Sequence, residues 1–507
     1  MDKEKKFVED IYKGYTHKGD YISFGASIYD QKIHSDLKVT APLKTLNRHG
    51  LVTGATGTGK TKSIQVLCEK LSEKSIPVLI MDIKGDVSGL SQPGVINEKI
   101  TERVNSIAIE WEPKSYPVEF LSITNETGVR MRATLSEFGP ILFSKILELN
   151  ETQQSVISVI YKFADDMRLP LVDLKDIKKL IQYISNEGKE KFKQEYGSVS
   201  TASTGLILRK IIEIEDQGAD IFFGERSFDA EDLLRVDDKG YGYINILRLS
   251  SIQDKPKMFS TFMLSLLSEV FETFPEVGDL DQPKLVLVID EAHLIFKEAS
   301  KALLSQLETV IKLIRSKGVG IIFCTQSPTD IPKQILGQLG MKIQHSLRAF
   351  SAQDRQAIKL ISDNFPLSDY YKTDDVITSL GIGEALITLL NEKGEPTPLV
   401  HTLINPPQSR MDVITNSEME SIVNKSSLVY KYKESIDSET AYELLSKKLE
   451  DSLEKDDVKK VEKEKSILGE LSKDPFVKSM AKSATTSFVR NITGQLTRGI
   501  LGSLLKK

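Results

Sequence analysis

Short aliphatic runs, each ended by a polar or glycine-rich turn, recur along this chain and predict the strands of a sheet. They lie at residues 51–52, 76–82, 242–247, 284–289, 319–326 and 341–350. Consecutive aliphatic positions are typical of parallel strands that helices cover on both faces. A last pair of apolar runs, joined by residues 391–396, predicts a β-hairpin. The pattern indicates an α/β fold with a mostly parallel sheet.

Between residues 138 and 235 the apolar positions recur at three- and four-residue spacing instead. The stretches with this period are residues 139–149, 152–167 and 173–186. Strand signals resume after this region, so we interpret 138–235 as a helical insertion in the core. The core would then consist of residues 48–137 and 236–407, preceded by a short, partly extended leader, residues 1–47.

The last hundred residues have a different character. Residues 408–475 are predicted to form a charged helical linker, since the stretch from 446 onward is dense in mixed charge. Residues 476–507 contain cations but no acid, namely Lys478, Lys482, Arg490, Arg498, Lys506 and Lys507. Apolar residues from Phe488 to Leu504 fall near one helical face. This basic amphipathic tail could contact its own protein, a partner, an anionic lipid surface or DNA, and we favour packing or oligomer contact.

Composition narrows the class of protein. The chain has 507 residues, of which 40% are hydrophobic and 27% charged, as in ordinary globular proteins. No apolar run approaches the length of a membrane span, and Cys68 and Cys324 lie far apart in apolar segments. We therefore expect a cytoplasmic protein. The net charge of −5 argues against a general nucleic-acid coat protein but leaves room for a ring with a basic lining.

Candidate chemistry begins directly after the first predicted core strand. Eight residues there match the phosphate-loop pattern G-x-x-x-x-G-K-[ST]: Gly54, Ala55, Thr56, Gly57, Thr58, Gly59, Lys60 and Thr61. A strand precedes them, and the apolar residues that follow have helical spacing. A glycine-rich turn that binds nothing would not require this agreement of every fixed position and both flanks.

The physical reason for this pattern is anion binding. Glycines permit positive φ angles, which let successive N–H groups point at phosphate oxygens, and the following helix adds the positive end of its dipole. We expect Lys60 to reach the β- and γ-phosphates of ATP. The hydroxyl of Thr61 would bind Mg²⁺.

Hydrolysis also needs a positioned water and charge compensation. The aliphatic run 285–289 delivers Asp290 and Glu291 to the edge where parallel sheets bind ligands. We predict that Asp290 holds Mg²⁺ and that Glu291 acts as general base. Asp82 ends an earlier strand in the same way and is a further candidate for the metal. The alternative is a core strand followed by two solvated acids.

Three more polar residues are candidates for the terminal phosphate. Gln326 ends the strand after Glu291 and could sense the γ-phosphate and hold the water, or simply cap the strand. Arg315 and Arg348 could supply positive charge to the transition state. For a single arginine, a place on the protein surface is the alternative.

Together these segments resemble a known family. The stretches "NRHGLVTGATGTGKT", "MDIKGDVSGL", "KLVLVIDEAHLIF", "LIRSKGVGIIFCTQSPTDIP", "LGQLGMKIQHSLRAF" and "LGIGEAL" are similar to the HerA/FtsK superfamily of P-loop motor ATPases. They are most similar to its bacterial HerA-like, or YjgR-like, branch. The resemblance covers nearly the whole chain, and the combination of motifs is more specific than the phosphate loop alone.

The resemblance implies a RecA-like core assembled into a homo-hexameric ring with ATP at the subunit interfaces. In archaeal HerA such a ring translocates duplex DNA with a nuclease partner. It also implies roles for single residues: Gln326 as the sensor glutamine, Arg315 as the arginine on the preceding helix, and Arg48 as a finger reaching a neighbouring subunit. Archaeal HerA carries a β-barrel ahead of its core, and the short segment before Arg48 leads us to expect a truncated or absent barrel. A nuclease partner is correspondingly less expected.

The sequence favours an ATP-driven, DNA-translocating or helicase-like motor. One rival is a ring ATPase that remodels protein or acts at a membrane surface through residues 476–507. Another is a nucleotide-dependent switch with slow turnover. Stimulation of ATP turnover by DNA would separate the first from the others.

Overall fold

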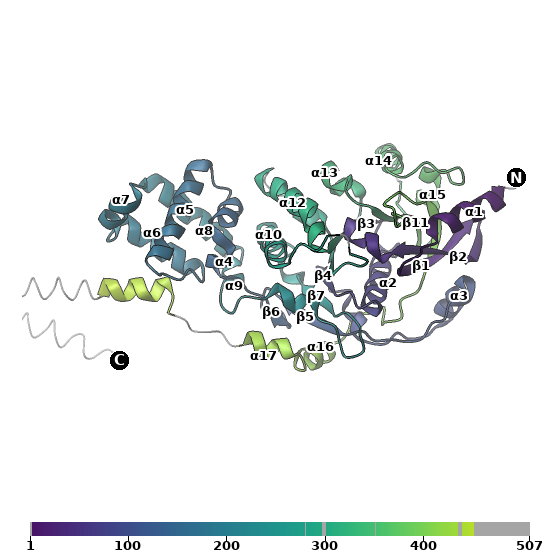
Figure 1. Ribbon diagram of the computed structural model, residues 1–507, viewed down its shortest axis with the longest axis horizontal. Coiled ribbons are helices and arrows are strands. Elements are labelled where there is room, and N and C mark those ends of the chain that lie inside the picture. Colours follow the sequence, from purple (N-terminus) through teal and green to yellow (C-terminus); the bar gives the residue numbers. More distant parts are fainter. Residues whose placement is uncertain (1–2, 279, 297–300, 350, 434–438, 451–507) are drawn as a thin grey trace, which may run out of the picture. The chain divides into compact units, whose positions relative to one another are not determined.

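A computed structural model of the chain describes residues 3–278, 280–296, 301–349, 351–433 and 439–450 (Figure 1). The chain divides into two compact units, Met1–Ala441 and Tyr442–Lys507. The described residues of the second unit, 442–450, are helical. The predicted tail, 476–507, lies outside the described residues, as do residues 434–438 and 451–475 of the predicted linker.

One sheet of twelve strands organises the first unit. Its order is β2-β1-β12-β11-β10-β3-β9-β8-β4-β7-β5-β6. The strands are β1 (Tyr21–Tyr29), β2 (Lys32–Pro42), β3 (Gly50–Thr53), β4 (Val78–Asp82), β5 (Val118–Ser122), β6 (Val129–Arg130), β7 (Ile244–Arg248), β8 (Leu285–Ile289), β9 (Val319–Thr325), β10 (Met341–Gln344), β11 (Glu384–Thr388) and β12 (Val400–Ile404). The eight strands from β10 to β6 pair in parallel, and the pairs from β2 to β10 are antiparallel. This confirms the predicted α/β fold with a mostly parallel sheet.

Aliphatic side chains explain why the parallel strands occupy the centre. Every residue of β3, β4, β8 and β9 is buried. Such strands must be covered on both faces, and helices do so here. In this arrangement the carboxyl ends of the parallel strands meet at one edge of the sheet, where folds of this kind bind ligands.

Helices follow the strands along most of the first unit. Those outside the insertion are α1 (Lys3–Tyr15), α2 (Lys60–Glu73), α3 (Glu98–Ile107), α10 (Pro256–Thr273), α11 (His293–Phe296), α12 (Lys301–Ile314), α13 (Lys333–Leu336), α14 (Ala352–Ser362), α15 (Thr373–Ser379), α16 (Asn416–Val423) and α17 (Ser427–Lys433). Of these, α2 starts inside the phosphate-loop motif and brings its first residues to the carboxyl end of β3. Among the described residues, no helix combines the length and the apolar character needed to cross a membrane.

The region between β6 and β7 is helical, as its periodicity indicates. Its helices are α4 (Leu135–Ile146), α5 (Glu151–Asp166), α6 (Leu174–Ser185), α7 (Lys189–Tyr196), α8 (Thr201–Asp216) and α9 (Ala219–Phe222). Capping boxes begin α4, α5 and α6 at Thr134, Asn150 and Asp173, where side chains satisfy the first free N–H groups. Helices α5 to α8 gather in one cluster (Figure 1).

The segment predicted as a short, partly extended leader, residues 1–47, contributes α1, β1 and β2 to the core. Strand β1 pairs with both β2 and β12, with Gly25 opposite Ile404. A Cβ on Gly25 would come within 1.9 Å of the Leu403 carbonyl oxygen, so this close approach requires glycine. Phe7 and Ile11 of α1 are fully buried in the same core. The predicted boundary before Arg48 therefore does not coincide with a structural boundary.

The predicted hairpin near the end of the core is confirmed. Strands β11 and β12 pair antiparallel, with Glu384 opposite Leu403 and Ile387 opposite Val400. Residues 391–396 turn between them, and Gly394 adopts a φ of 81°. This hairpin links the parallel strands, through β10, to the β1–β2 pair.

Candidate nucleotide site

The predicted phosphate loop joins β3 to α2. Its three glycines adopt φ angles of 150° at Gly54, 79° at Gly57 and 116° at Gly59. A Cβ added at Gly57 would meet no atom within 4 Å, so the loop is open on that side. Backbone N–H groups in such a conformation form a concave site for an anion at the positive end of α2.

Two segments from the far end of the core hold this loop in place. The N–H of Ala55 donates to the carbonyl of Ser346 at 2.9 Å, and the N–H of Gly383 donates to the carbonyl of Thr58 at 3.0 Å. His345 is fully buried beneath the loop and lies 2.9 Å from the Ser63 hydroxyl through Nε2. Burial lowers the pKa of His345 to about 4. A neutral imidazole therefore supports the loop near neutral pH.

Lys60 is buried at the start of α2. Its ammonium donates to the carbonyls of Gly54 at 2.6 Å and Ala55 at 3.1 Å. Burial lowers the pKa of this lysine. Because its donors rest on carbonyls of the loop itself, the lysine is already at the position where phosphate oxygens would replace them.

Thr61 lies beside an acid that the sequence reasoning did not select. Its hydroxyl donates to Asp86 at 3.1 Å. Asp82, the predicted metal ligand, accepts instead from the N–H groups of Gly85 at 2.7 Å and Val87 at 3.4 Å. Burial, with the nearby charge of Asp86, raises the pKa of Asp82 to about 7. The structure thus places Asp86 beside Thr61, whereas Asp82 accepts hydrogen bonds from the turn that follows β4.

Asp290 and Glu291 follow β8 at the same edge of the sheet. Glu291 is 5% exposed, has a φ of 46°, and forms an ion pair with Lys84. His293 Nδ1 lies 3.1 Å from its second carboxylate oxygen. Burial, and then the charge of Glu291, raises the pKa of Asp290. The two acids therefore reach the phosphate-loop edge, as predicted, but Glu291 is not solvated.

The remaining predicted residues divide between the two edges of the sheet. Gln326 directly follows β9, at the edge that carries the phosphate loop, and is exposed. Arg348 follows β10 at that edge and is also exposed. Arg48 and Arg315 precede β3 and β9 respectively, so they lie at the opposite, amino edge.

The two arginines at the amino edge are close to a shared residue, His49. Its ring accepts from the Ile321 N–H at 3.0 Å and lies 2.8 Å from the Ile311 carbonyl. Burial lowers the pKa of His49 to about 4, and the charge of Arg315 contributes. The guanidinium of Arg48 lies against the Gly394 turn. Neither arginine reaches the phosphate loop of its own chain, since β3 or β9 separates them from it.

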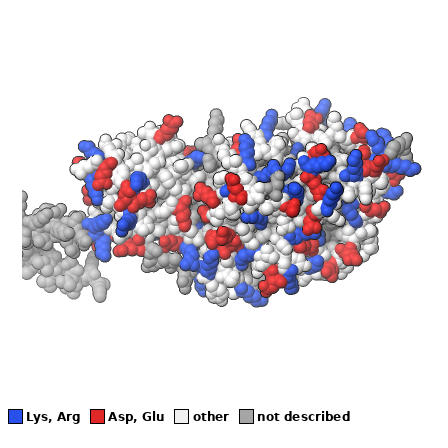
Figure 2. Space-filling view, viewed as in Figure 1, with Lys and Arg blue, Asp and Glu red and all other residues white. Residues whose placement is uncertain are grey.

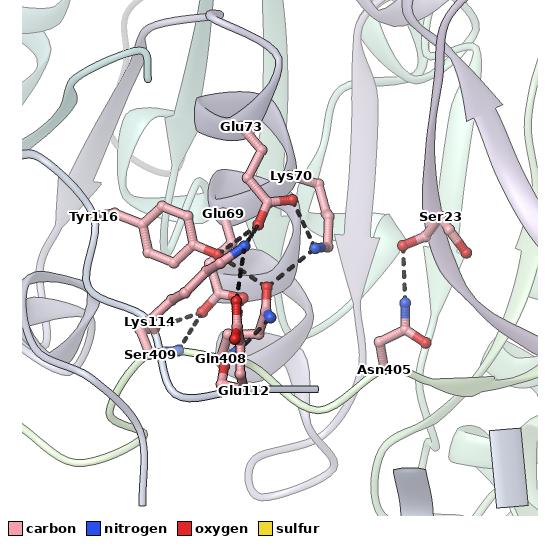
Figure 3. Close-up of polar contacts among 10 residues, drawn as sticks. All are labelled: Ser23, Glu69, Lys70, Glu73, Glu112, Lys114, Tyr116, Asn405, Gln408 and Ser409. Carbon is pink, nitrogen blue, oxygen red and sulfur yellow. Dashed lines mark hydrogen bonds and ion pairs between the residues drawn. The ribbon is translucent and has the colours of Figure 1, made fainter. Parts of the chain in front are cut away.

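Hydrogen bonds join α2 to residues 405–412. Glu69 accepts from the N–H groups of Gln408 at 3.0 Å and Ser409 at 2.9 Å, and from the Ser409 hydroxyl at 2.6 Å (Figure 3). Gln65, one turn earlier, donates to the Arg410 carbonyl at 3.0 Å. The opening residues of the predicted linker 408–475 therefore pack in the core, against the helix that carries the phosphate loop.

The residues present fit ATP and Mg²⁺. The open glycine loop with its buried lysine fits a chain of phosphates, and a hydroxyl and carboxylates stand beside it at Thr61, Asp86 and Asp290. Among the described residues there is no cluster of three or more histidine, cysteine or acidic side chains able to hold a metal alone. Mg²⁺ usually takes few protein ligands and completes its shell with phosphates and water.

Sequence reasoning missed four residues of this site: Lys84, Asp86, His293 and His345. A signal existed for two of them, because Lys84 and Asp86 lie in the "DIKGD" turn directly after a strand that ends at the ligand edge. Nothing in the local sequence marks His345 as a residue of the nucleotide site. Its role depends on the pairing of β10 with β3, which only the fold reveals.

Sequence comparison gives an independent assignment. The family model described as "Helicase HerA-like C-terminal" matches residues 28–507. The chain is 27% identical over 366 residues to the DNA double-strand break repair helicase HerA of Sulfurisphaera tokodaii, covering 70% of this chain and 65% of that protein. It is 24% identical to the DNA import protein CedB of Sulfolobus acidocaldarius, covering 70% of this chain and 52% of that protein. The match thus spans less than two-thirds of either relative.

Solved structures agree at the level of the fold. The bacterial conjugative coupling protein TrwB in its unbound form has a TM-score of 0.53 at 12% identity, covering 81% of this chain and 94% of TrwB. TrwB in complex with the ATP analogue ADPNP has a TM-score of 0.52 at 13% identity, covering 80% of this chain and 100% of TrwB. This likeness confirms the predicted RecA-like fold. Since the family model covers nearly all of the chain, the protein belongs to the HerA-like family of P-loop ATPases.

Proposed function

We propose that this chain is an ATP-hydrolysing motor that acts on DNA as a translocase or helicase. The observation that carries the proposal is the meeting of Lys60, Thr61, Asp290 and Glu291 at one edge of the sheet. A phosphate loop binds nucleotide, and a buried carboxylate beside it can take a proton from water. A site with both can hydrolyse ATP repeatedly, whereas a slow nucleotide switch needs only the phosphate loop.

The residues suggest the following reaction. Lys60 and the loop N–H groups bind the β- and γ-phosphates, and Glu291 orients a water and accepts its proton. The water oxygen bonds to the γ-phosphorus while the bond to the ADP oxygen breaks. Bound Mg²⁺, held by Thr61 and Asp290, would neutralise charge on the phosphate oxygens. Gln326, at the end of the neighbouring strand, is suited to hold the same water.

DNA as the substrate is supported by family membership and by two of the relatives, a DNA double-strand break repair helicase and a DNA import protein. The net charge of −5 limits how the chain could bind DNA. On the face drawn in Figure 2, the lysine and arginine side chains are interspersed with aspartate and glutamate. With a net charge of −5, the chain would hold DNA through a local basic lining, such as the channel of a ring.

A homo-hexameric ring is supported by the position of Arg48. The phosphate loop of its own chain lies at the other end of β3, so this arginine can complete a site only in a neighbouring subunit. We therefore propose that Arg48 acts in trans, while Arg315, beside His49, supports the same edge. A nuclease partner is not part of this proposal.

Mixing two inactive variants tests the trans role of Arg48. An Arg48→Ala subunit keeps its own phosphate loop, and a Lys60→Ala subunit keeps its arginine, so mixed rings contain some complete sites. We expect steady-state ATP turnover to reappear in the mixture. Mixing Lys60→Ala with Glu291→Gln is the control, because both changes damage the same chain's site and no complete site forms. Intact mixed rings without recovered turnover would contradict a finger in trans.

DNA dependence tests the substrate. We expect the ATP turnover of the full chain, at a measured oligomeric state, to rise on addition of duplex DNA and the effect to weaken as salt increases. The rival is a ring that remodels protein or acts at a membrane surface through residues 476–507. Turnover that ignores DNA but rises with anionic lipid vesicles would favour the membrane rival, and turnover that ignores both would favour a protein substrate.

A further inference from the structure

Lys84 lies in the turn after β4, among the charged groups of the nucleotide site. Its side chain is 39% exposed, and its ammonium forms an ion pair with Glu291, the proposed general base. The same turn contains Asp86, which accepts from Thr61. Lys84 is therefore a second lysine at this edge of the sheet, supplied by a different strand from Lys60.

The two lysines lie close enough for their charges to interact. Burial lowers the pKa of Lys60, and the charge of Lys84 lowers it further. Burial also acts to lower the pKa of Lys84, but its contact with Glu291 and the charges of Asp290 and Asp86 outweigh burial and raise it. Lys84 thus lies beside Glu291 at the edge of the sheet that carries the phosphate loop.

The ion pair has a consequence for catalysis. A carboxylate oxygen of Glu291 that accepts a hydrogen bond from the Lys84 ammonium has less room to accept one from the attacking water. The γ-phosphate brings negative charge to the same place, and a lysine side chain is long and flexible enough to exchange one anion for another. Gly85, next in the chain, has a φ of 78° and open space where a Cβ would be, so the turn is not packed against other atoms there.

We propose that Lys84 is a second phosphate-binding lysine, which leaves Glu291 for the γ-phosphate when ATP binds. The inference rests on the proposed ATPase function and deepens it. Binding of ATP would both recruit the cation and release the base, so that Glu291 becomes available only when a γ-phosphate is present. ADP, which lacks that phosphate, would leave the Lys84–Glu291 pair intact.

This mechanism predicts a selective loss of ATP affinity in Lys84→Met. We expect the full-chain variant to bind a non-hydrolysable ATP analogue with Mg²⁺ roughly 10- to 100-fold more weakly, the effect of losing one charge-assisted hydrogen bond. Its ADP affinity should remain within about threefold of the unchanged protein, since no γ-phosphate contact is lost. Titration calorimetry with both nucleotides measures the ratio directly. Lys84→Arg, which retains the charge, should recover part of it.

Lys62→Met is the matched control. Lys62 lies in the first turn of α2, but its ammonium is directed to Gln65 at 2.8 Å and to the Met411 carbonyl. Removing this lysine should leave the ratio of ATP to ADP affinity unchanged. The comparison separates a specific contact from a general loss of positive charge near the loop.

The possible outcomes are distinct. An ATP-to-ADP affinity ratio in Lys84→Met equal to that of the unchanged protein would overturn the inference, as would faster hydrolysis, which would make Lys84 only a restraint on Glu291. Equal weakening of both nucleotides would also overturn it, as the sign of a disturbed loop. Failure of the proposed ATPase function would appear separately, as absence of nucleotide binding by the unchanged protein.

Discussion

The Lys60→Ala protein is expected to lose ATP turnover. Lys60 is 7% exposed, and its ammonium is already held over the loop by two carbonyls, at Gly54 and Ala55. The other contacts of the loop with phosphate come from backbone N–H groups, so this side chain is the main positive point charge available to the β- and γ-phosphates. We expect nucleotide affinity to fall roughly 10- to 100-fold and turnover to drop below detection.

The measurement is steady-state ATP hydrolysis together with a direct nucleotide titration. Because removal of a buried, hydrogen-bonded side chain could loosen the loop, thermal unfolding without nucleotide should be compared with that of the unchanged protein. Lys62→Ala serves as the matched control on the same turn of α2. Turnover near the unchanged level in Lys60→Ala would show that the nucleotide site has been assigned to the wrong loop.

The parallel half of the sheet could be predicted because its strands are short and almost wholly aliphatic. β4, β8 and β9 are buried along their whole length, which leaves a strong local signal. The antiparallel edge was only half predicted. The β11–β12 hairpin is contiguous in sequence, whereas β1 pairs with β12 across almost the whole core, and local patterns carry no information about such a distant partner.

The residues of the nucleotide site also divide into those that local sequence predicts and those that only the fold brings together. The fixed spacing of the phosphate loop and the acids after β8 identified Lys60, Thr61, Asp290 and Glu291, because that chemistry depends on local sequence. The ion pair of Glu291 with Lys84 joins two turns separated by the helical insertion, and only strand order brings them together. The sequence therefore predicted the groups that the proposed reaction uses, but not the lysine that forms an ion pair with one of them.

Segment 405–412 adds a connection between the nucleotide site and the end of the core. Glu69 and Gln65 lie on the helix that begins at the phosphate loop, and both bind this segment. Figure 3 shows the contacts of Glu69 with Gln408 and Ser409. Burial raises the pKa of Glu69, and the N–H and hydroxyl donors of Gln408 and Ser409 offset part of that effect. Since the segment continues into α16 and α17, it joins the helix that begins at the phosphate loop to the helices that follow the core.

Glu291→Gln should separate nucleotide binding from hydrolysis. The amide has nearly the same shape as the carboxylate but cannot accept a proton from water. We expect ATP to bind while its hydrolysis slows roughly 10²- to 10⁴-fold, the usual range for loss of a general base. Single-turnover hydrolysis and nucleotide titration on the same protein measure the two effects. Binding should not weaken, because the change also frees Lys84 from its carboxylate partner and leaves it available to the γ-phosphate.

Glu126→Gln is a suitable control for this change, since Glu126 is another acid near the carboxyl ends of the strands. Its carboxylate contacts the Ser251 N–H at 2.7 Å and the Ser250 hydroxyl at 3.0 Å, and it lies between β5 and β6, which are beyond β4 and β7 from β3 in the strand order. The Glu126→Gln change should leave ATP turnover unchanged.

Asp290→Asn should instead weaken the Mg²⁺ dependence of ATP binding, because Asp290 is assigned to the metal. If Asp290→Asn hydrolyses ATP normally while Glu291→Gln fails to bind nucleotide, the roles of the two acids are the reverse of those assigned to them.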